Sequence, residues 1–288
     1  MPDNIRNRGA SVRARLLALS KERAQPFDIL LTRYVLERLL HRLGTTSYKD
    51  RFALKGAMLL TVWFPDPHRQ TRDVDLLGFG DPTPEAVLAI FREVCAIALD
   101  DGVVFDIDKL ELDRTREELE YGGLRIRTFA TVGGARIRVV VDIGFGDATE
   151  PGLTEADIPV LLDQPLLRMH AYARETVIAE KFQAMVAFGH GNTRMKDFYD
   201  ILVLSRSYEF SGDALARAIA ATFARRKTEI PVSLPDALTD DFASDPAKMQ
   251  QWESFLRTVA VRPGPLPDVV KELATFLMRH AEAARTRS

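Results

Sequence analysis

The chain has 288 residues, of which 46% are hydrophobic and 28% charged, and its formal net charge at pH 7 is -2. This composition is typical of a globular protein with a sizeable core, and it excludes disordered, collagen-like and low-complexity chains. No apolar run approaches the roughly 18 residues of a membrane span, and no secretory signal is apparent. The single cysteine, Cys95, excludes an internal disulfide and a thiolate metal site, so we expect a cytoplasmic protein.

The charge is distributed unevenly along the chain. Residues 1–60 contain twelve Lys or Arg and five Asp or Glu, a net charge of +7, so the remaining residues carry -9. Three of the cations, Arg33, Arg38 and Arg42, lie within one helical pattern. They form either a solvated helix face or a basic surface for nucleic-acid phosphates.

Helical patterns dominate the first third of the chain. Apolar residues at spacings of three and four predict a helix over 26–44 and a second over 52–64. A helix that begins with prolines is predicted over 82–102. Cys95 lies in its apolar pattern, which assigns this residue to the core. Between the last two helices, residues 71–79 have the character of a strand.

Strand patterns follow, and then helices again. Residues 102–112 alternate in part, and residues 124–145 predict a hairpin with its turn at Gly133–Gly134. The next stretch, with three prolines, is typical of a loop. We therefore predict an α+β fold: a small mixed sheet with flanking helices in a domain of residues 1–165, followed by a helical domain of residues 166–288.

The sharpest chemical feature is Asp73-Val74-Asp75 in the predicted strand. Side chains two positions apart on a strand share a face, so these carboxylates repel each other unless a cation lies between them. Mg²⁺ is usually held by one or two carboxylates together with substrate phosphates. Such pairs are also common on exposed strands without a function. Asp106 and Asp108 form a second pair, which the spacing alone does not exclude.

Asp142 closes the very apolar strand of the hairpin. A carboxylate at such a position is costly to bury unless it is paired or bound to a metal. Asp142 is therefore a candidate third metal ligand. The glycines that follow, Gly144 and Gly146, are not a dinucleotide-binding fingerprint, because the third glycine and the helix are missing.

The helical half contributes a second group of charged residues. Lys181 lies on an apolar helix stripe, where it either extends its ammonium group to water or contacts phosphate. Asp197 and Asp200 are one turn apart at the start of the next helix, beside Arg194 and Lys196. Carboxylates at that position also stabilise a helix through its dipole, without any other role.

Motifs of several other enzyme classes are absent from the sequence. There is no G-x-x-x-x-G-K-[ST] phosphate loop, no G-x-S-x-G nucleophile elbow and no H-E-x-x-H zinc motif. These absences argue against P-loop, serine-hydrolase and zinc-peptidase chemistry.

Four motifs occur together in an order that resembles the AbiEii/AbiGii-type toxins of the nucleotidyltransferase superfamily. They are LKGAMLL…RQTRDVDLL, VVVDIGFGD, ARETVIAEKFQAMV and NTRMKDFYDIL, and the match runs from about residue 50 to 205. That family comprises the toxin halves of bacterial type IV-like toxin–antitoxin and phage-defence systems. The resemblance implies a nucleotidyltransferase-like sheet domain that transfers a nucleotide from an NTP to RNA with Mg²⁺ or Mn²⁺. The expected acceptor is the 3′ end of tRNA, whose modification blocks translation.

The resemblance also implies roles for residues of the first domain. Asp73 and Asp75 match the metal-binding pair, and Asp142 matches the third strand carboxylate of the superfamily. Gly56 matches the motif glycine that contacts the nucleotide. Ala57 departs from the usual second Gly or Ser, which removes a contact to the triphosphate.

In the helical domain, the resemblance implies that Lys181 is the motif lysine that neutralises triphosphate charge. Asp197 matches the acidic residue of the last motif and would orient that lysine or activate the acceptor hydroxyl. Arg194 and Lys196 share this motif as candidate nucleotide-binding residues.

Expected partners are an NTP, RNA and an antitoxin encoded nearby, a winged-helix regulator, with no membrane partner. The basic segments 1–60 and 214–227 are candidates for gripping RNA. Two alternatives stay open. One is nucleotidyl transfer to a small molecule or a protein hydroxyl. The other is a non-catalytic protein that binds RNA or a partner, which Ala57 favours and the intact acidic residues argue against.

Overall fold

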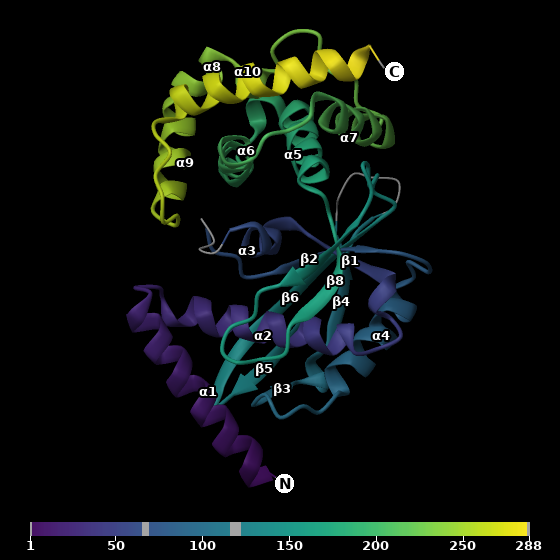
Figure 1. Ribbon diagram of the computed structural model, residues 1–288, viewed down its shortest axis with the longest axis vertical. Coiled ribbons are helices and arrows are strands. Elements are labelled where there is room, and N and C mark those ends of the chain that lie inside the picture. Colours follow the sequence, from purple (N-terminus) through teal and green to yellow (C-terminus); the bar gives the residue numbers. More distant parts are fainter. Residues whose placement is uncertain (1, 65–68, 116–121, 287–288) are drawn as a thin grey trace. The chain divides into compact units, whose positions relative to one another are not determined.

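The computed structural model describes residues 2–64, 69–115 and 122–286 of the chain. They belong to two compact units. The first consists of Met1–Gly146 and Glu155–Ala171, and the second of Asp147–Thr154 and Tyr172–Ser288. The first unit is built around a sheet and the second is helical (Figure 1). The predicted α+β fold is therefore confirmed.

The described residues form an eight-stranded mixed sheet. Its strands are β1 (Phe52–Lys55), β2 (Val74–Gly78), β3 (Val103–Phe105), β4 (Glu111–Arg114), β5 (Leu124–Val132), β6 (Ala135–Phe145), β7 (Thr154–Ile158) and β8 (Leu167–Ala171). Their order is β3-β5-β6-β2-β1-β8-β7, and β4 also pairs with β5. Strand β2 is parallel to β6 and antiparallel to β1, whereas β5 and β6 form the predicted antiparallel hairpin.

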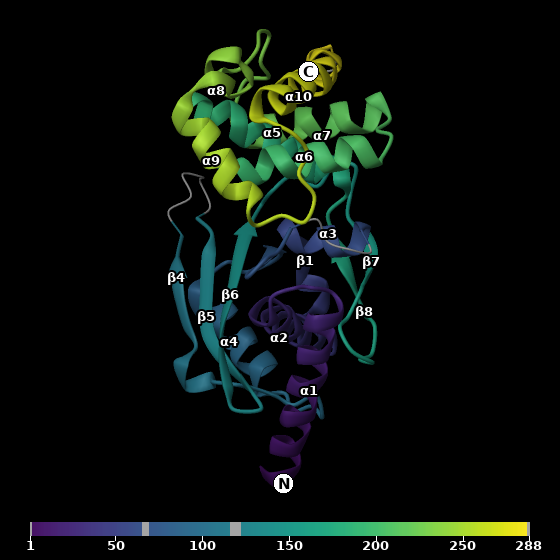
Figure 2. The same cartoon turned by 90° about the vertical axis from the view of Figure 1, so that its left-hand side faces the viewer.

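Helices cover one face of this sheet. They are α1 (Pro2–Glu22), α2 (Phe27–Gly44), α3 (Leu60–Trp63) and α4 (Pro84–Ala96), with 3-10 turns at Lys49–Arg51, Gly56–Leu59 and Ile107–Lys109. Helices α2 and α4 agree with the sequence patterns. They contact each other, α2 lies against β6, and α4 lies against β3 and β4 (Figure 2). Every second side chain of β5 and β6 is buried, and the alternate ones are left half-exposed or exposed.

The helix predicted over 52–64 is wrong in its first part. Residues Phe52–Lys55 instead form β1, an inner strand between β2 and β8. Two features explain the difference. Phe52, Ala53 and Leu54 are all buried, so the segment lacks the alternation of buried and exposed positions that would mark it as a strand. Gly56 then has a positive φ of 72°, which ends the strand and is incompatible with a continuous helix.

The arginines of α2 point into the first unit. Arg38 and Arg42 are each only 1% exposed. Arg42 makes a two-pronged salt bridge to buried Asp101, with nitrogen–oxygen distances of 2.6 and 3.1 Å, and Arg33 pairs with buried Glu37. These three side chains are therefore neither a solvated helix face nor a basic surface for phosphates. Arg33 and Arg42 form internal ion pairs, whereas buried Arg38 donates a hydrogen bond to the side chain of Gln164.

The second unit is a bundle. Its helices are α5 (Arg174–Phe188), α6 (Met195–Ser207), α7 (Gly212–Arg225), α8 (Asp240–Ser244), α9 (Pro246–Leu256) and α10 (Leu266–Arg285), with 3-10 turns at Gly189–Gly191 and Asp236–Leu238. Helix α5 packs on α7, and the long α10 crosses α6, α7 and α8 (Figure 1). Within the described ranges, no helix has an apolar stretch long enough to cross a bilayer.

Candidate active site

A row of charged residues crosses four neighbouring strands on the face of the sheet that carries the half-exposed side chains. The strand register places Lys55 on β1 opposite Asp75 on β2, and Asp75 beside Asp142 on β6. Asp142 is in turn opposite Arg125 on β5. Residues in register on adjacent strands project to the same side of a sheet, so these four side chains line one surface. The parallel pairing of β2 and β6 sets the two carboxylates side by side.

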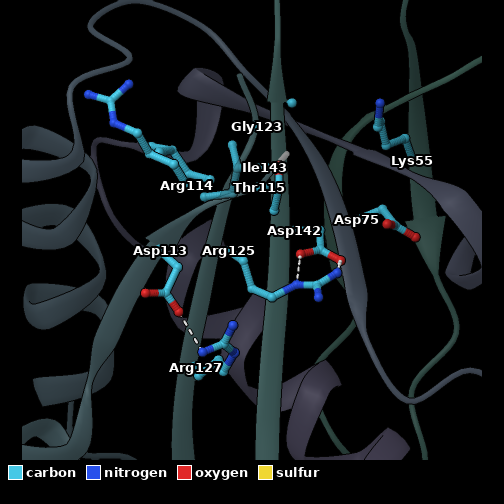
Figure 3. A pocket seen from close by; sticks show the side chains of 12 residues that line it. Lys55, Asp75, Asp113, Arg114, Thr115, Gly123, Arg125, Arg127, Asp142 and Ile143 are labelled. Atoms are coloured by element: carbon cyan, nitrogen blue, oxygen red, sulfur yellow. Dashed lines mark hydrogen bonds and ion pairs between the residues drawn. The ribbon is translucent and has the colours of Figure 1, made fainter. Parts of the chain in front are cut away.

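Arg125 makes a two-pronged contact in this row. Its Nε and one terminal nitrogen donate to the two oxygens of Asp142 at 2.6 and 2.7 Å, as the dashed lines of Figure 3 show. The hydrogen bond to Asp142 is the main cause that raises the pKa of Arg125, and the charges of Asp73 and Asp75 add to it. Both carboxylates of the D-x-D pair therefore lie within electrostatic range of one guanidinium group.

A pocket of about 400 Å³ opens over this row. Lys55, Asp75, Arg125 and Asp142 all contribute to its lining, and Figure 3 shows them on neighbouring strands around it. Two neighbouring carboxylates are thus flanked by a cation on each side along one wall. Such an arrangement suits a ligand that carries several negative charges and brings a metal ion with it.

The backbone at Gly56 lies close against the Asp75 carboxylate. A Cβ atom added at Gly56 would overlap that carboxylate, whose Cγ would be 2.5 Å away. The residue also has a φ of 72°, which side-chain-bearing residues rarely adopt. A glycine is therefore required here for two independent reasons. The backbone of the 3-10 turn that follows β1 comes close to the carboxylate. The contact of Gly56 to a nucleotide remains a prediction.

Asp73 lies just before β2, where Thr71 donates a hydrogen bond from its hydroxyl to the carboxylate at 2.8 Å. It lines a second depression, of about 550 Å³, to which Arg125 also contributes. The two carboxylates of the D-x-D pair thus border different depressions that meet at Arg125. Asp106 and Asp108, the other D-x-D pair, lie at the 3-10 turn Ile107–Lys109 and line neither depression.

The donor set fits a metal that arrives with its substrate. Among residues 2–64, 69–115 and 122–286, no three acidic, histidine or cysteine side chains converge closely enough to hold a metal by themselves. Asp142, the predicted third ligand, is engaged by Arg125. Mg²⁺ commonly needs only one or two carboxylates when phosphate oxygens complete its coordination. Asp73 and Asp75 are able to supply these carboxylates.

The charged residues predicted in the helical half also come together, within the second unit. Lys181 on α5 contacts Asp197 at 2.7 Å and Asp200 at 2.8 Å, both on α6. The lysine side chain is 12% exposed, and both carboxylates are buried. Arg194 pairs with the other oxygen of Asp197. Lys196, in contrast, points outward and is exposed.

The protonation of Asp197 follows from these neighbours. Burial acts to raise the pKa of this carboxyl, but the charges and hydrogen bonds of Lys181 and Arg194 outweigh burial and hold the pKa below its ordinary value. Asp197 is therefore ionised at neutral pH. Lys181 is not simply extended to water at the edge of a stripe, because it neutralises two buried carboxylates.

Other polar residues of the second unit form a separate cluster. The Tyr172 hydroxyl contacts Asp147 at 3.1 Å and Glu180 at 3.4 Å, and Arg226 pairs with both carboxylates. Burial is the main cause that raises the pKa of Tyr172 well above its ordinary value. Arg226, part of the basic segment 214–227, is therefore held in an internal ion cluster.

The row formed by Lys55, Asp75, Asp142 and Arg125 is called the carboxylate row below. The sequence patterns do not identify its two cations. Lys55 was hidden because its segment was assigned to a helix. Arg125 was visible in principle, because the predicted turn at Gly133–Gly134 sets the hairpin register that pairs it with Asp142.

Comparison with solved structures supports the fold. A crystal structure of a proposed nucleotidyltransferase from H. pylori matches with a TM-score of 0.52 and 15% identity, covering 90% of this chain and 97% of the other. The structure of JHP933 from Helicobacter pylori matches with a TM-score of 0.52 and 14% identity, covering 90% and 94%. No curated protein matches the sequence.

A family model described as the nucleotidyl transferase AbiEii toxin of type IV toxin–antitoxin systems matches residues 38–275. The match spans both units and includes every residue of the carboxylate row and of the Lys181 cluster. The chain therefore belongs to the AbiEii nucleotidyltransferase toxin family.

Proposed function

We propose that this protein transfers a nucleotide from an NTP to RNA, with the 3′ end of tRNA as the expected acceptor, and that this transfer inhibits translation. The observation that carries the proposal is the row formed by Lys55, Asp75, Asp142 and Arg125 across four strands. Family membership makes nucleotidyl transfer the chemistry to which this row is assigned. An antitoxin partner follows from the same membership, and a winged-helix regulator acting in the cytoplasm is our proposal for its kind and place.

Each residue of the row has a distinct task in this proposal. Lys55 and Arg125 offer ammonium and guanidinium donors to phosphate oxygens, which stabilises the charge that develops during transfer. Asp73 and Asp75 hold the Mg²⁺ or Mn²⁺ that accompanies the NTP. The metal, when bound, neutralises phosphate charge and polarises the reacting phosphoryl group. Asp142 orients Arg125 through the two-pronged salt bridge.

The Lys181 cluster of the second unit carries a separate proposal. We assign Lys181 to the neutralisation of triphosphate charge, Asp197 to its orientation, and Arg194 and Lys196 to nucleotide binding. The support is that Lys181, Asp197 and Arg194 form one ion cluster. Lys196→Ala is the sharpest test of binding, because this side chain is exposed. Its removal is expected to weaken NTP binding without lowering the melting temperature, and unchanged NTP affinity would remove Lys196 from the proposal.

The acceptor is tested by supplying each of four labelled NTPs with Mg²⁺ or Mn²⁺ to a cell extract. Ribonuclease and protease digestions then identify the labelled product. Label that ribonuclease releases and protease does not is the expected result, with purified tRNA as a sufficient acceptor. Label on protein or on a small molecule would support transfer to those hydroxyls, and no label from any NTP would support a non-catalytic binder.

A further inference from the structure

Part of the basic segment 1–60 is unable to contact a polynucleotide. Arg38 and Arg42 of α2 are buried, and Arg42 is tied to Asp101. Neither guanidinium is able to reach a phosphate group without breaking the core of the first unit. The exposed arginines of that unit lie on other elements, among them Arg13 and Arg15 of α1 and several on the sheet.

The β5–β6 hairpin presents such arginines on its open face. Along β6, Ile137, Val139 and Val141 are buried, whereas Arg136 and Arg138 alternate with them and are exposed. The register places partners of the same face opposite on β5, and these include Arg125, Arg127 and Phe129. This basic face runs along the hairpin toward Asp142.

One contact on the basic face combines a cation with an aromatic ring. The Cζ atom of Arg136 lies 3.7 Å from the centre of the Phe129 ring. Arg138, which is in register with Phe129, is exposed, and no hydrogen bond or ion pair joins it to another described residue. Guanidinium groups beside an aromatic ring offer charge for phosphates and flat surfaces for bases, which is how proteins bind single-stranded nucleic acids.

The basic face leads into the depression that contains Asp73. This depression, of about 550 Å³, is lined by four arginines, namely Arg72, Arg125, Arg136 and Arg138. The first three are paired with Asp28, Asp142 and Asp106, so Arg138 is the cation of this lining on which the argument rests. Arg136 and Asp142 are six positions apart along the strand, a length of about 20 Å at ~3.3 Å per residue. That length exceeds what a single triphosphate needs and suits several nucleotides of extended chain.

We propose that this depression and the basic face bind the single-stranded end of the acceptor polynucleotide, while the pocket beside Asp75 takes the NTP. The assignment rests on the proposed function. Arg125 lines both depressions and therefore marks the boundary between the two substrates. The terminal hydroxyl of the acceptor is placed at Asp73, and the bases extend along β6 over Arg138 and Phe129.

The test compares two charge reversals in the full chain. Arg138→Glu changes the proposed surface, and Arg92→Glu is the matched control, because Arg92 is an exposed residue of α4 away from both depressions. Binding of a labelled single-stranded RNA is measured by fluorescence anisotropy at several salt concentrations. Arg138→Glu is expected to weaken binding about tenfold and to reduce the salt slope by about one, as loss of a phosphate contact does. Arg92→Glu is expected to leave both unchanged.

Further measurements separate the possible outcomes. Binding of a fluorescent NTP analogue is expected to be equal in Arg138→Glu and the unaltered protein, and Arg138→Ala gives a milder variant whose melting temperature checks folding. A similar loss with single-stranded DNA supports a site that does not read the ribose. If both charge reversals weaken RNA binding equally, or neither weakens it, the proposed RNA-binding surface is wrong. A third outcome is that only Arg138→Glu weakens RNA binding, while the unaltered protein transfers no labelled nucleotide to RNA. In that case the proposed function is wrong and the RNA-binding surface is still supported.

Discussion

At the scale of single residues, Gly56 shows how backbone and carboxylate depend on each other. Gly56→Ala would place a methyl group against Asp75 at a φ of 72°. Gly134→Ala is the matched control, because Gly134 has a φ of 81° in the hairpin turn but has nothing within 4 Å of an added Cβ. Both variants are expected to lose about 1–3 kcal/mol of stability from backbone strain.

Only Gly56→Ala is expected to abolish nucleotide transfer, because only there must the carboxylate move. Thermal unfolding and a transfer assay on the same two proteins check this pair of outcomes. A Gly56→Ala protein that transfers as well as Gly134→Ala would mean that the position of the Asp75 carboxylate does not matter for the reaction.

Lys181 is expected to govern the stability of the second unit in acid. The pKa of Asp197 is held below its ordinary value, so the stability from its ionised form is present above about pH 4, the unfolded value, and is lost as pH falls through the folded pKa. Lys181→Met removes one of its two cations and raises that folded pKa. The acid-unfolding midpoint should therefore move to higher pH.

The same substitution is expected to cost about 3–5 kcal/mol at neutral pH, since it leaves two buried carboxylates undercompensated. Lys196→Met, a change of the same chemistry at an exposed position of α6, is the control and should alter neither quantity. Circular dichroism during pH and denaturant titrations measures both. Identical behaviour of the two variants would show that the Lys181 ion pairs contribute nothing to folding.

At the scale of elements, we expect opposite changes in folding stability when the two buried arginines of α2 are replaced. Arg42 is paired with Asp101, so Arg42→Met leaves a buried carboxylate alone and should destabilise by about 3–5 kcal/mol. Arg38 has two buried nitrogens, Nε and one Nη, without a hydrogen-bond partner among the described residues, and burial lowers its pKa. Arg38→Met should therefore be close to neutral or stabilising. Denaturant unfolding of the two variants decides, and an equal cost for both would contradict the difference in pairing.

The elements also show what sequence patterns are able to predict. The hairpin was predicted with its turn, and the turn fixes the register that joins Arg125 to Asp142. The strand β1 was not predicted, because the four residues Phe52–Lys55 are too few to display a period and resemble a buried helix segment. The sequence predicts a loop over the residues that form β7, since prolines surround them. Pairing partners far along the chain, rather than local preference, decide such short strands.

The arginines of α2 show a further limit of prediction from sequence. Arg33, Arg38 and Arg42 occupy a helix whose sequence fits either an exposed basic face or an internal network. Only the positions of Glu37 and Asp101 reveal which applies, and Asp101 is far away in the sequence. In contrast, the pairing of Lys181 with Asp197 brings together two residues that the motifs had already singled out.

At the scale of the whole molecule, we predict that toxicity depends on catalysis. Asp73→Ala is expected to abolish growth inhibition when expressed without an antitoxin, while the protein remains folded, because Asp73 is half-exposed and supports no buried network. Growth curves and a melting temperature measured on the purified variant check both parts. Full toxicity of a folded Asp73→Ala protein would remove this residue from the mechanism.

The most direct measurement of the central claim is transfer of labelled nucleotide to purified tRNA by three proteins. These are the unaltered chain, Asp75→Asn and Asp108→Asn, the last altered in the D-x-D pair that lies outside the carboxylate row. The account predicts that the unaltered chain and Asp108→Asn transfer label at similar rates, and that Asp75→Asn is slower by at least about 100-fold, the scale on which loss of a positioned electrostatic group acts. Equal transfer by Asp75→Asn and Asp108→Asn would contradict the role of Asp75 in nucleotide transfer.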